Sequence, residues 1–357
     1  MNIGKSMAYE NKGDDGAQTA GSRPTAVQYV EAAEGDAGQR LDNFLVRTLK
    51  GVPRTHVYRL LRKGEVRVNS KRAKPEQRLA AGDRIRLPPV RRPEPGEGGG
   101  ETRAPSASLQ KLITEAIVYE DPDLLVVNKP AGVAVHGGSG MTHGVIEVLR
   151  AMRPDARELD LVHRLDRDTS GCLIVAKRRA ALRDLHAQFR EGRAEKRYLA
   201  LVCGKWDLGQ KRIELPLATG ERRGGERHVA VRSHGQMAVS TFRPVQFFGT
   251  AATLMEVEIG TGKTHQIRVH AAYAGHPVAG DDKYGDRERN EELRRYGVER
   301  MFLHAASIGV DRPGTQEPLH VSAPLGPELH AALEALLKAP GSRRGEARRR
   351  ARSRAGR

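Results

Sequence analysis

A polar segment of nine residues, HRLDRDTSG at His163–Gly171, joins two apolar runs near the middle of this chain. The runs are Leu159–Val162 and Cys172–Ala176, so the pattern predicts a strand, a tight polar loop and a second strand. The loop contains four charged residues, which are Arg164, Asp166, Arg167 and Asp168. A solvated hairpin held by ion pairs explains such a loop, and so does a loop that presents one carboxylate for chemistry. The loop alone favours the hairpin, and the other segments of the chain decide between the two.

From Ile113 onward the sequence alternates short apolar runs with few helical segments. Strand-like runs occur in AIVYEDPDLLVVNK, EKRYLALVCGKW, KRIELPLA, HVAVRSHGQMAVSTFRPVQFF, ATLMEVEI and MFLHAASIGV. Helical spacing of apolar residues occurs in THGVIEVLRAM, KRRAALRDLHAQFREG, HQIRVHAAYAG and PELHAALEALLKA. Many neighbouring strands with few helical crossovers predict an α+β domain built on a mostly antiparallel mixed sheet.

The segment from Ala37 to Val90 is strongly basic, with 14 Lys and Arg against 4 Asp and Glu. The end from Ala339 to Arg357 adds 8 Arg against 1 Glu, so these two segments account for the net charge of +17. Between Ala37 and Val90, apolar residues at helical spacing predict two short helices with a break at Pro53. Two strands follow, the first of which runs into an Asn-Ser turn.

A concentrated positive segment is typical of a protein that binds a phosphate backbone, and anionic membrane is the main rival partner. No apolar run approaches the roughly 20 residues of a spanning helix, and the N-terminal sequence lacks the apolar core of a signal peptide. Cys172 and Cys203 lie in apolar strand-like runs, which indicates buried, reduced thiols. We therefore expect a cytoplasmic protein with no membrane partner.

These patterns divide the chain into five regions. Residues 1–27 are small and polar, which indicates a disordered leader, and residues 37–90 form the basic domain. Residues 91–112 are rich in Pro, Gly and Glu and are predicted to be a flexible linker. The α+β domain spans 113–338, and an Arg-rich disordered tail occupies 339–357.

Three motifs in the α+β domain are incomplete versions of known sites. Asp168-Thr-Ser-Gly matches the loop of aspartic proteases, whose mechanism needs two such carboxylates, and the chain has no second copy. Gly262-Lys-Thr imitates the end of a phosphate-binding loop, but Val257 stands where the first glycine of that loop belongs. His265 and His270 are five residues apart on a presumed helix, which turns them to different faces, so we predict no metal site.

Taken together, HRLDRDTSG, EKRYLALV and GTGKTHQIRVHAAYAGHPVAGDDKYG resemble a pseudouridine synthase of the RluA family. The basic domain resembles the S4 RNA-binding module in its RLDNFL opening, its second helix and its Val-Arg-Val-Asn strand. Within the family, the resemblance is greatest to the branch that modifies large-subunit ribosomal RNA. Lys263, where the family commonly has Arg, and Gly280, where this branch often has a large apolar residue, are the departures.

The resemblance implies roles for three residues. The catalytic aspartate of the family falls on Asp166, the tyrosine that contacts the target base on Tyr198, and the basic residue that pairs with the aspartate on Arg268. RNA binding is expected of ten basic residues, which are Arg40, Arg54, Arg59, Arg62, Lys63, Lys71, Arg72, Arg164, Arg167 and Lys196. The implied reaction uses no cofactor.

The implied function is the isomerisation of specific uridines in 23S ribosomal RNA, at several sites that include the peptidyl-transferase region. The expected partner is large-subunit ribosomal RNA, and the protein is expected to be a monomer. Three alternatives stay open: the same chemistry on another rRNA or tRNA site, a non-catalytic rRNA-binding or ribosome-assembly protein, and a glycosidase. The glycosidase would need a second acid, for which Asp168 is the candidate.

Overall fold

The computed structural model describes residues 27–49, 52, 54–90, 104–137, 143–156, 158–223 and 226–339. The chain forms two compact units, Met1–Thr102 and Arg103–Arg357. Nearly all of the predicted leader and tail, and residues 91–103 of the predicted linker, lie outside the described residues. No helix in the described ranges is long and apolar enough to cross a membrane.

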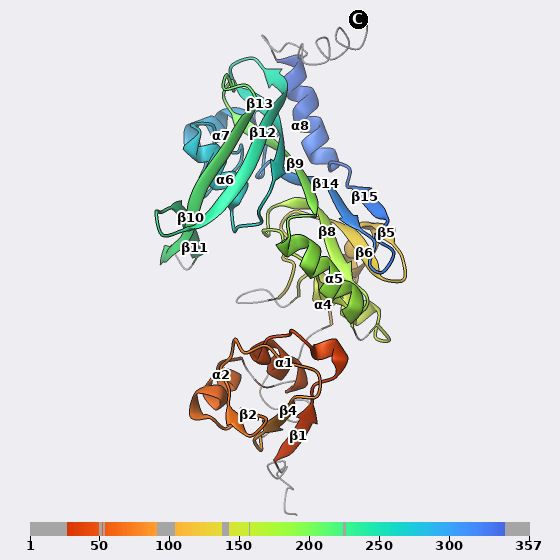
Figure 1. The fold of residues 1–357 in the computed structure, drawn as a ribbon. Coiled ribbons are helices and arrows are strands. Elements are labelled where there is room, and N and C mark those ends of the chain that lie inside the picture. Colours follow the sequence, from red (N-terminus) through yellow and green to blue (C-terminus); the bar gives the residue numbers. More distant parts are fainter. Residues whose placement is uncertain are drawn as a thin grey trace, which may run out of the picture. The chain divides into compact units, whose positions relative to one another are not determined.

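The first unit is a small sheet with two helices (Figure 1). Its strands are β1 (Gln28–Glu31), β2 (Arg67–Val68), β3 (Lys71–Arg72) and β4 (Arg84–Leu87), in the order β1-β4-β2-β3. The helices α1 (Leu41–Thr48) and α2 (Arg54–Lys63) follow a short 3-10 turn at Glu34–Asp36. Leu41, Phe44 and Leu45 of α1 enter one apolar core with Leu60 and Leu61 of α2, which confirms the two predicted helices. Strand β1 was not predicted, and it pairs with β4 ahead of the expected start at residue 37.

The second unit is built on a sheet of 11 strands (Figure 1). The main path has the order β11-β10-β12-β13-β9-β14-β8-β6-β5, while β15 pairs with β14 and β7 pairs with β8. Their bounds are β5 Ile117–Glu120, β6 Leu124–Lys129, β7 Asp160–Leu161, β8 Ser170–Ala176, β9 Glu195–Cys203, β10 Lys211–Arg223, β11 Glu226–Val231, β12 Gln236–Phe248, β13 Ala252–Ile259, β14 Leu303–Asp311 and β15 Pro318–Ser322. Among the strand pairs that the structure describes, β14 with β8 is parallel and the others are antiparallel, as predicted.

Six helices accompany this sheet within the described ranges: α3 Ala107–Glu115, α4 Val145–Met152, α5 Arg179–Arg190, α6 Gln266–Tyr273, α7 Arg287–Arg294 and α8 Pro327–Lys338. Strand β8 is buried along its whole length at the centre of the largest apolar core. A second core lies under α8, where Leu329 and Leu336 pack with Leu201 and Phe302.

The predicted linker is too long at its C-terminal end. Residues 107–115 form helix α3, which Ser106 caps by accepting a hydrogen bond from the Leu109 N–H group at 3.3 Å. Ile113 on this helix is fully buried in the core of the second unit. The helix was missed because its single buried anchor gives a weak apolar period next to a Pro- and Gly-rich stretch. Helix α7 and strand β15 were also not predicted.

Candidate active site

The predicted strand, loop and strand around HRLDRDTSG are present. Strand β7 pairs with β8, with Asp160 opposite Ala176 and Leu161 opposite Val175, so residues 162–169 form the connection. The Thr169 N–H group donates to the Asp166 carbonyl at 3.2 Å, which closes a turn behind the Asp166 side chain. Gly171, the second residue of β8, has φ +110°, and a Cβ there would lie 2.2 Å from the Ala305 carbonyl oxygen of β14. Glycine is therefore required where the loop joins the sheet.

A buried lysine fastens this loop to another one. The Lys129 ammonium donates to the carbonyls of Pro130, Val133 and Arg167 at 2.8, 2.8 and 2.9 Å, and its residue is 0% exposed. The Arg167 carbonyl also accepts the Gly132 N–H group at 2.9 Å. Burial lowers the pKa of Lys129 to about 7, and the charges of Asp168 and Asp166 act in the opposite direction. Three carbonyl acceptors match the three N–H groups of the charged form.

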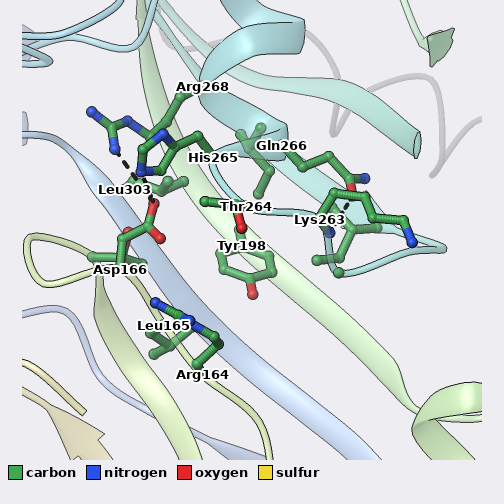
Figure 2. Close-up of a pocket in the computed structure, with 14 residues that line it drawn as sticks. Arg164, Leu165, Asp166, Tyr198, Lys263, Thr264, His265, Gln266, Arg268 and Leu303 are labelled. Atoms are coloured by element: carbon green, nitrogen blue, oxygen red, sulfur yellow. Dashed lines mark hydrogen bonds and ion pairs between the residues drawn. The ribbon is translucent and has the colours of Figure 1, made fainter. Parts of the chain in front are cut away.

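The loop forms one wall of a pocket with a volume of about 90 Å³ (Figure 2). Asp166 comes from the loop, Tyr198 from the middle of β9, and Arg268 from α6. Thr264 and His265, on the turn that leads into α6, line the same pocket. The structure thus brings together the three residues for which the resemblance implies catalytic roles.

Arg268 lies between two carboxylates. It donates from Nε and Nη2 to both oxygens of Asp281, at 2.7 and 2.8 Å, and from Nη1 to Asp166 Oδ2 at 3.4 Å. Burial opposes the charge of Arg268, but Asp281 and Asp166 outweigh it and hold the pKa of Arg268 above its usual value. Burial acts against the Asp281 carboxylate as well, yet Arg268 and two backbone N–H groups keep the pKa of Asp281 below its usual value. Both groups therefore stay charged although they are buried.

His265 is a member of this site that the sequence reasoning did not assign. Its Nε2 lies 3.7 Å from Asp166 Oδ2, and its Nδ1 is 2.8 Å from the Tyr284 hydroxyl. That hydroxyl accepts the Val229 N–H group at 2.9 Å, so its own proton is available to His265 Nδ1. An Nδ1 that accepts puts the ring proton on Nε2, facing Asp166. Burial, with the charges of Arg268 and Lys283, lowers the pKa of His265 although Asp166 raises it.

The backbone of His265 is itself unusual. It has φ +54° and ψ +18°, the left-handed conformation, directly before the first residue of α6. Histidine adopts this conformation at a cost, and such strain is concentrated at functional sites. The conformation turns the His265 ring toward Asp166, as Figure 2 shows.

Tyr198 lies on β9 and lines the pocket from that strand. It pairs with Val257 of β13 and with Ala305 of β14, so the sheet fixes its backbone on both sides. Burial, and then the negative charge of Asp166, raises the pKa of the Tyr198 phenol. The ring therefore enters the pocket as a neutral phenol, and no charge opposes the stacking of a base on it.

The predicted RNA-binding residues fall into several environments. Arg59, Arg62, Lys63 and Lys71 are exposed on the first unit. Arg40 pairs with Asp42 at 2.7 Å, Arg72 donates to the Arg62 carbonyl, and the Arg54 side chain lies outside the described part of the chain. In the second unit, Arg164 is exposed and lines the pocket, and Arg167 pairs with Asp168 at 3.0 Å.

Lys196 requires a correction. Its residue is only 7% exposed, and its ammonium lies 5.3 Å from the centre of the Phe189 ring on α5. It lies on β9, where Glu195 and Arg197 point outward while Lys196 and Tyr198 point inward. Burial lowers the pKa of Lys196. The strand therefore turns Lys196 into the protein, away from where a phosphate would bind.

Three further expectations concern other chemistry. Asp168, the second acid that a glycosidase would need, pairs with Arg167 and does not line the pocket. Across the ranges that the structure describes, no group of three or more His, Cys, Asp and Glu side chains is placed to hold a metal ion. Cys172 and Cys203 are both buried, unpaired thiols, as predicted.

Comparison with known proteins connects this geometry to one family. Residues 39–85 match the S4 domain, and residues 123–273 match the family described as RNA pseudouridylate synthase. Ribosomal large subunit pseudouridine synthase C of Escherichia coli (strain K12) is 51% identical over 318 residues, covering 88% of this chain and 98% of that protein. The protein of the same description from Salmonella typhi is 51% identical over 315 residues, covering 87% of this chain and 97% of that protein.

Solved structures show the same fold for the second unit. The human protein RNA Pseudouridylate Synthase Domain Containing 4 superposes with a TM-score of 0.54 and 23% identity, covering 64% of this chain and 95% of that one. Human RNA Pseudouridylate Synthase Domain Containing 1 gives a TM-score of 0.51 and 27% identity, covering 63% and 96%.

Proposed function

The chain belongs to the RNA pseudouridylate synthase family, and on that basis we propose that it isomerises uridines of 23S ribosomal RNA to pseudouridine. The observation that carries the proposal is the Asp166 carboxylate at one end of a pocket that Arg268 and Tyr198 share. The curated relatives that are 51% identical are described as large-subunit enzymes, which supports that RNA as the substrate. Several sites, including the peptidyl-transferase region, are proposed as targets.

The reaction breaks the N1–C1′ bond of uridine, turns the uracil and forms a C5–C1′ bond, while C5 loses a proton and N1 gains one. Cleavage builds positive character at C1′, which a carboxylate beside the ribose stabilises. Asp166 is the proposed carboxylate, acting on the ribose as nucleophile or as base. Arg268 holds this carboxylate in place.

Tyr198 is proposed to contact the detached uracil. An aromatic ring offers a face on which a base stacks while it turns. The sheet holds the Tyr198 backbone between β13 and β14, so the ring keeps its place during the rearrangement.

The target base has to leave its stack to reach Asp166, which costs a few kcal/mol. Contacts with the RNA backbone offset that cost, and the S4 module supplies exposed cations for them, among them Arg59, Arg62 and Lys71. Because the catalytic set comes from one chain, we propose that the protein acts as a monomer, and in the cytoplasm, where ribosomal RNA is assembled.

The test is Asp166→Asn, a change that keeps the size of the side chain and removes the carboxylate. Pseudouridine formation in a 23S rRNA transcript, mapped by mass spectrometry, should fall by at least about a thousandfold. Affinity for the transcript should stay within about twofold. Appreciable residual turnover would exclude Asp166 as the reactive group. Unmodified 23S rRNA positions in a strain lacking the protein identify the target uridines, and an unchanged set of pseudouridines would favour a non-catalytic RNA-binding role.

A further inference from the structure

A second hollow, of about 310 Å³, lies beside the active-site pocket, where β10, β11 and β12 meet the turn before α6. Lys263 and Thr264 line both cavities, so the two share a wall. None of the three proposed catalytic residues lines the second hollow. The reaction described above therefore leaves it without a role.

The hollow is lined partly by apolar and partly by polar side chains. Leu217 and Val229 form its apolar part and are only 5% and 3% exposed. Around them lie the polar side chains of Thr219, Gln236 and Thr264, which are exposed. A nucleobase has the matching character, with two apolar faces and an edge of hydrogen-bond donors and acceptors. An amide side chain such as that of Gln236 can both donate to and accept from such an edge.

Lys263 lies at the junction of the two cavities. In Figure 2 it occupies the end of the active-site pocket opposite Asp166. Its ammonium donates to the Gln236 side-chain oxygen at 2.8 Å, which brings the charge to the rim of the second hollow. A cation between two base-sized cavities fits the phosphate that joins two successive nucleosides of one strand.

We propose that the second hollow binds the base of a nucleotide next to the target uridine, with Lys263 on the phosphate between them. This inference rests on the proposed function, since it extends the site of the reacting uridine by one nucleotide. A base held there adds binding energy that helps to keep the neighbouring uridine out of its stack. The hollow therefore contributes to the choice of uridine.

The experiment combines a change in the protein with a change in the RNA. Thr219 lines the hollow from β10 and pairs with Val229 on the same face of the sheet, so Thr219→Phe fills it. The probe is a 23S rRNA transcript ligated from a synthetic segment, in which the nucleotide on either side of a modified uridine is made abasic in turn. The control is Met237→Phe, a change at a residue that is 54% exposed on β12 and does not line the hollow.

For the wild-type protein, removing the base on one side is expected to lower kcat/KM by about tenfold. Thr219→Phe is expected to show about the same loss on intact RNA and no further loss when that base is removed. Removing the base on the other side should affect both proteins equally, and Met237→Phe should behave like the wild type. If Thr219→Phe does not fold, Gln236→Ala, at an exposed side chain, repeats the cycle with a smaller loss.

The proposal is overturned if the losses from Thr219→Phe and from base removal multiply, or if neither neighbouring base matters to the wild-type protein. Both results are obtained with RNA that the wild-type protein modifies, so they leave the proposed function standing. A wild-type protein that forms no pseudouridine in the transcript would instead contradict the proposed function.

Discussion

Arg268 binds Asp281 more closely than it binds Asp166, with two contacts of 2.7 and 2.8 Å against one of 3.4 Å. The Asp281 carboxylate also accepts the N–H groups of Lys283 and Tyr284, so its position is fixed by the chain on which it lies. Asp281 therefore determines where the guanidinium is held, and the weaker contact leaves Asp166 able to move toward a ribose.

Replacing Asp281 by Asn should affect both the stability of the protein and the position of Arg268 beside Asp166. The change removes one partner of a buried ion pair, which should lower the free energy of unfolding by about 3 kcal/mol. Arg268 would then turn toward Asp166, and a misplaced group should lower kcat by about a hundredfold. Urea denaturation and single-turnover kinetics measure the two effects. Asp282→Asn, on the exposed neighbour, is the control, and equal kcat values for the two variants would contradict a positioning role.

His265 should produce an acid limb in the pH profile of activity. Its pKa lies below the ordinary value of 6.5, chiefly because the ring is buried. As the pH falls through that pKa, the imidazolium forms and pairs with Asp166, 3.7 Å away, so turnover should fall. In His265→Asn, whose side chain tolerates the left-handed backbone, the limb should move to lower pH. The rate of this variant at pH 8 should be lower by about tenfold because the imidazole that lies 3.7 Å from Asp166 is lost. A limb that stays in place would assign it to another group.

His270 offers a test of stability against pH. It is fully buried on α6, and neither of its ring nitrogens has a hydrogen-bond partner among the residues that the structure describes. Burial lowers the pKa of His270 to about 4, so the folded state resists protonation between pH 6.5 and 4 while the unfolded state accepts it. The free energy of unfolding of the wild type should therefore fall by about 2 kcal/mol from this group between pH 7.5 and 5.

His270→Leu should remove that loss and add about 1 kcal/mol at pH 7.5, because no unsatisfied nitrogen is buried. Urea denaturation at the two pH values measures it. His330→Leu, at an exposed position of α8, serves as the control. Equal pH dependence in the wild type and His270→Leu would contradict the assignment.

The S4 module should dominate the salt dependence of RNA binding. Changing Arg59, Arg62, Lys63 and Lys71 together to Gln removes four exposed cations from the first unit. The slope of log K against log salt should become shallower by about three, since each phosphate contact contributes about 0.7 to 0.9. Filter binding over a salt series measures the slope, and kcat at saturating RNA should not change. An unchanged slope would mean that these cations do not bind the RNA backbone.

The position of Asp166 could be predicted from the sequence because the local pattern and the chain order agree. Two apolar runs flank a polar loop, and the structure has β7, the loop and β8 in that place. The inward position of Lys196 could also be predicted from the sequence, because strand alternation puts it on the same face as Tyr198. The expectation that Lys196 binds RNA is based on its charge and does not take into account that side chains alternate between the two faces of a strand.

His265 was missed for a different reason. Helical spacing was applied to His265 and His270, but α6 begins at Gln266, and the left-handed backbone of His265 makes the helical angle meaningless for its ring. Asp281 was missed because nothing local distinguishes a buried acid from an exposed one in DDKYG. Its partner Arg268 lies 13 residues earlier in the chain, and only the packing of the turn under α6 brings the two together.

The Arg167 carbonyl accepts both the Lys129 ammonium and the Gly132 N–H group, so both of its lone pairs are used. The loop that carries Asp166 cannot swing open like a lid without breaking both bonds and leaving a buried ammonium short of one acceptor. The loop therefore opens only by local unfolding, which takes microseconds to seconds, and not by the nanosecond motion of surface loops. The RNA meets a catalytic wall that is already assembled, and its binding energy is available to reshape the RNA instead of the enzyme.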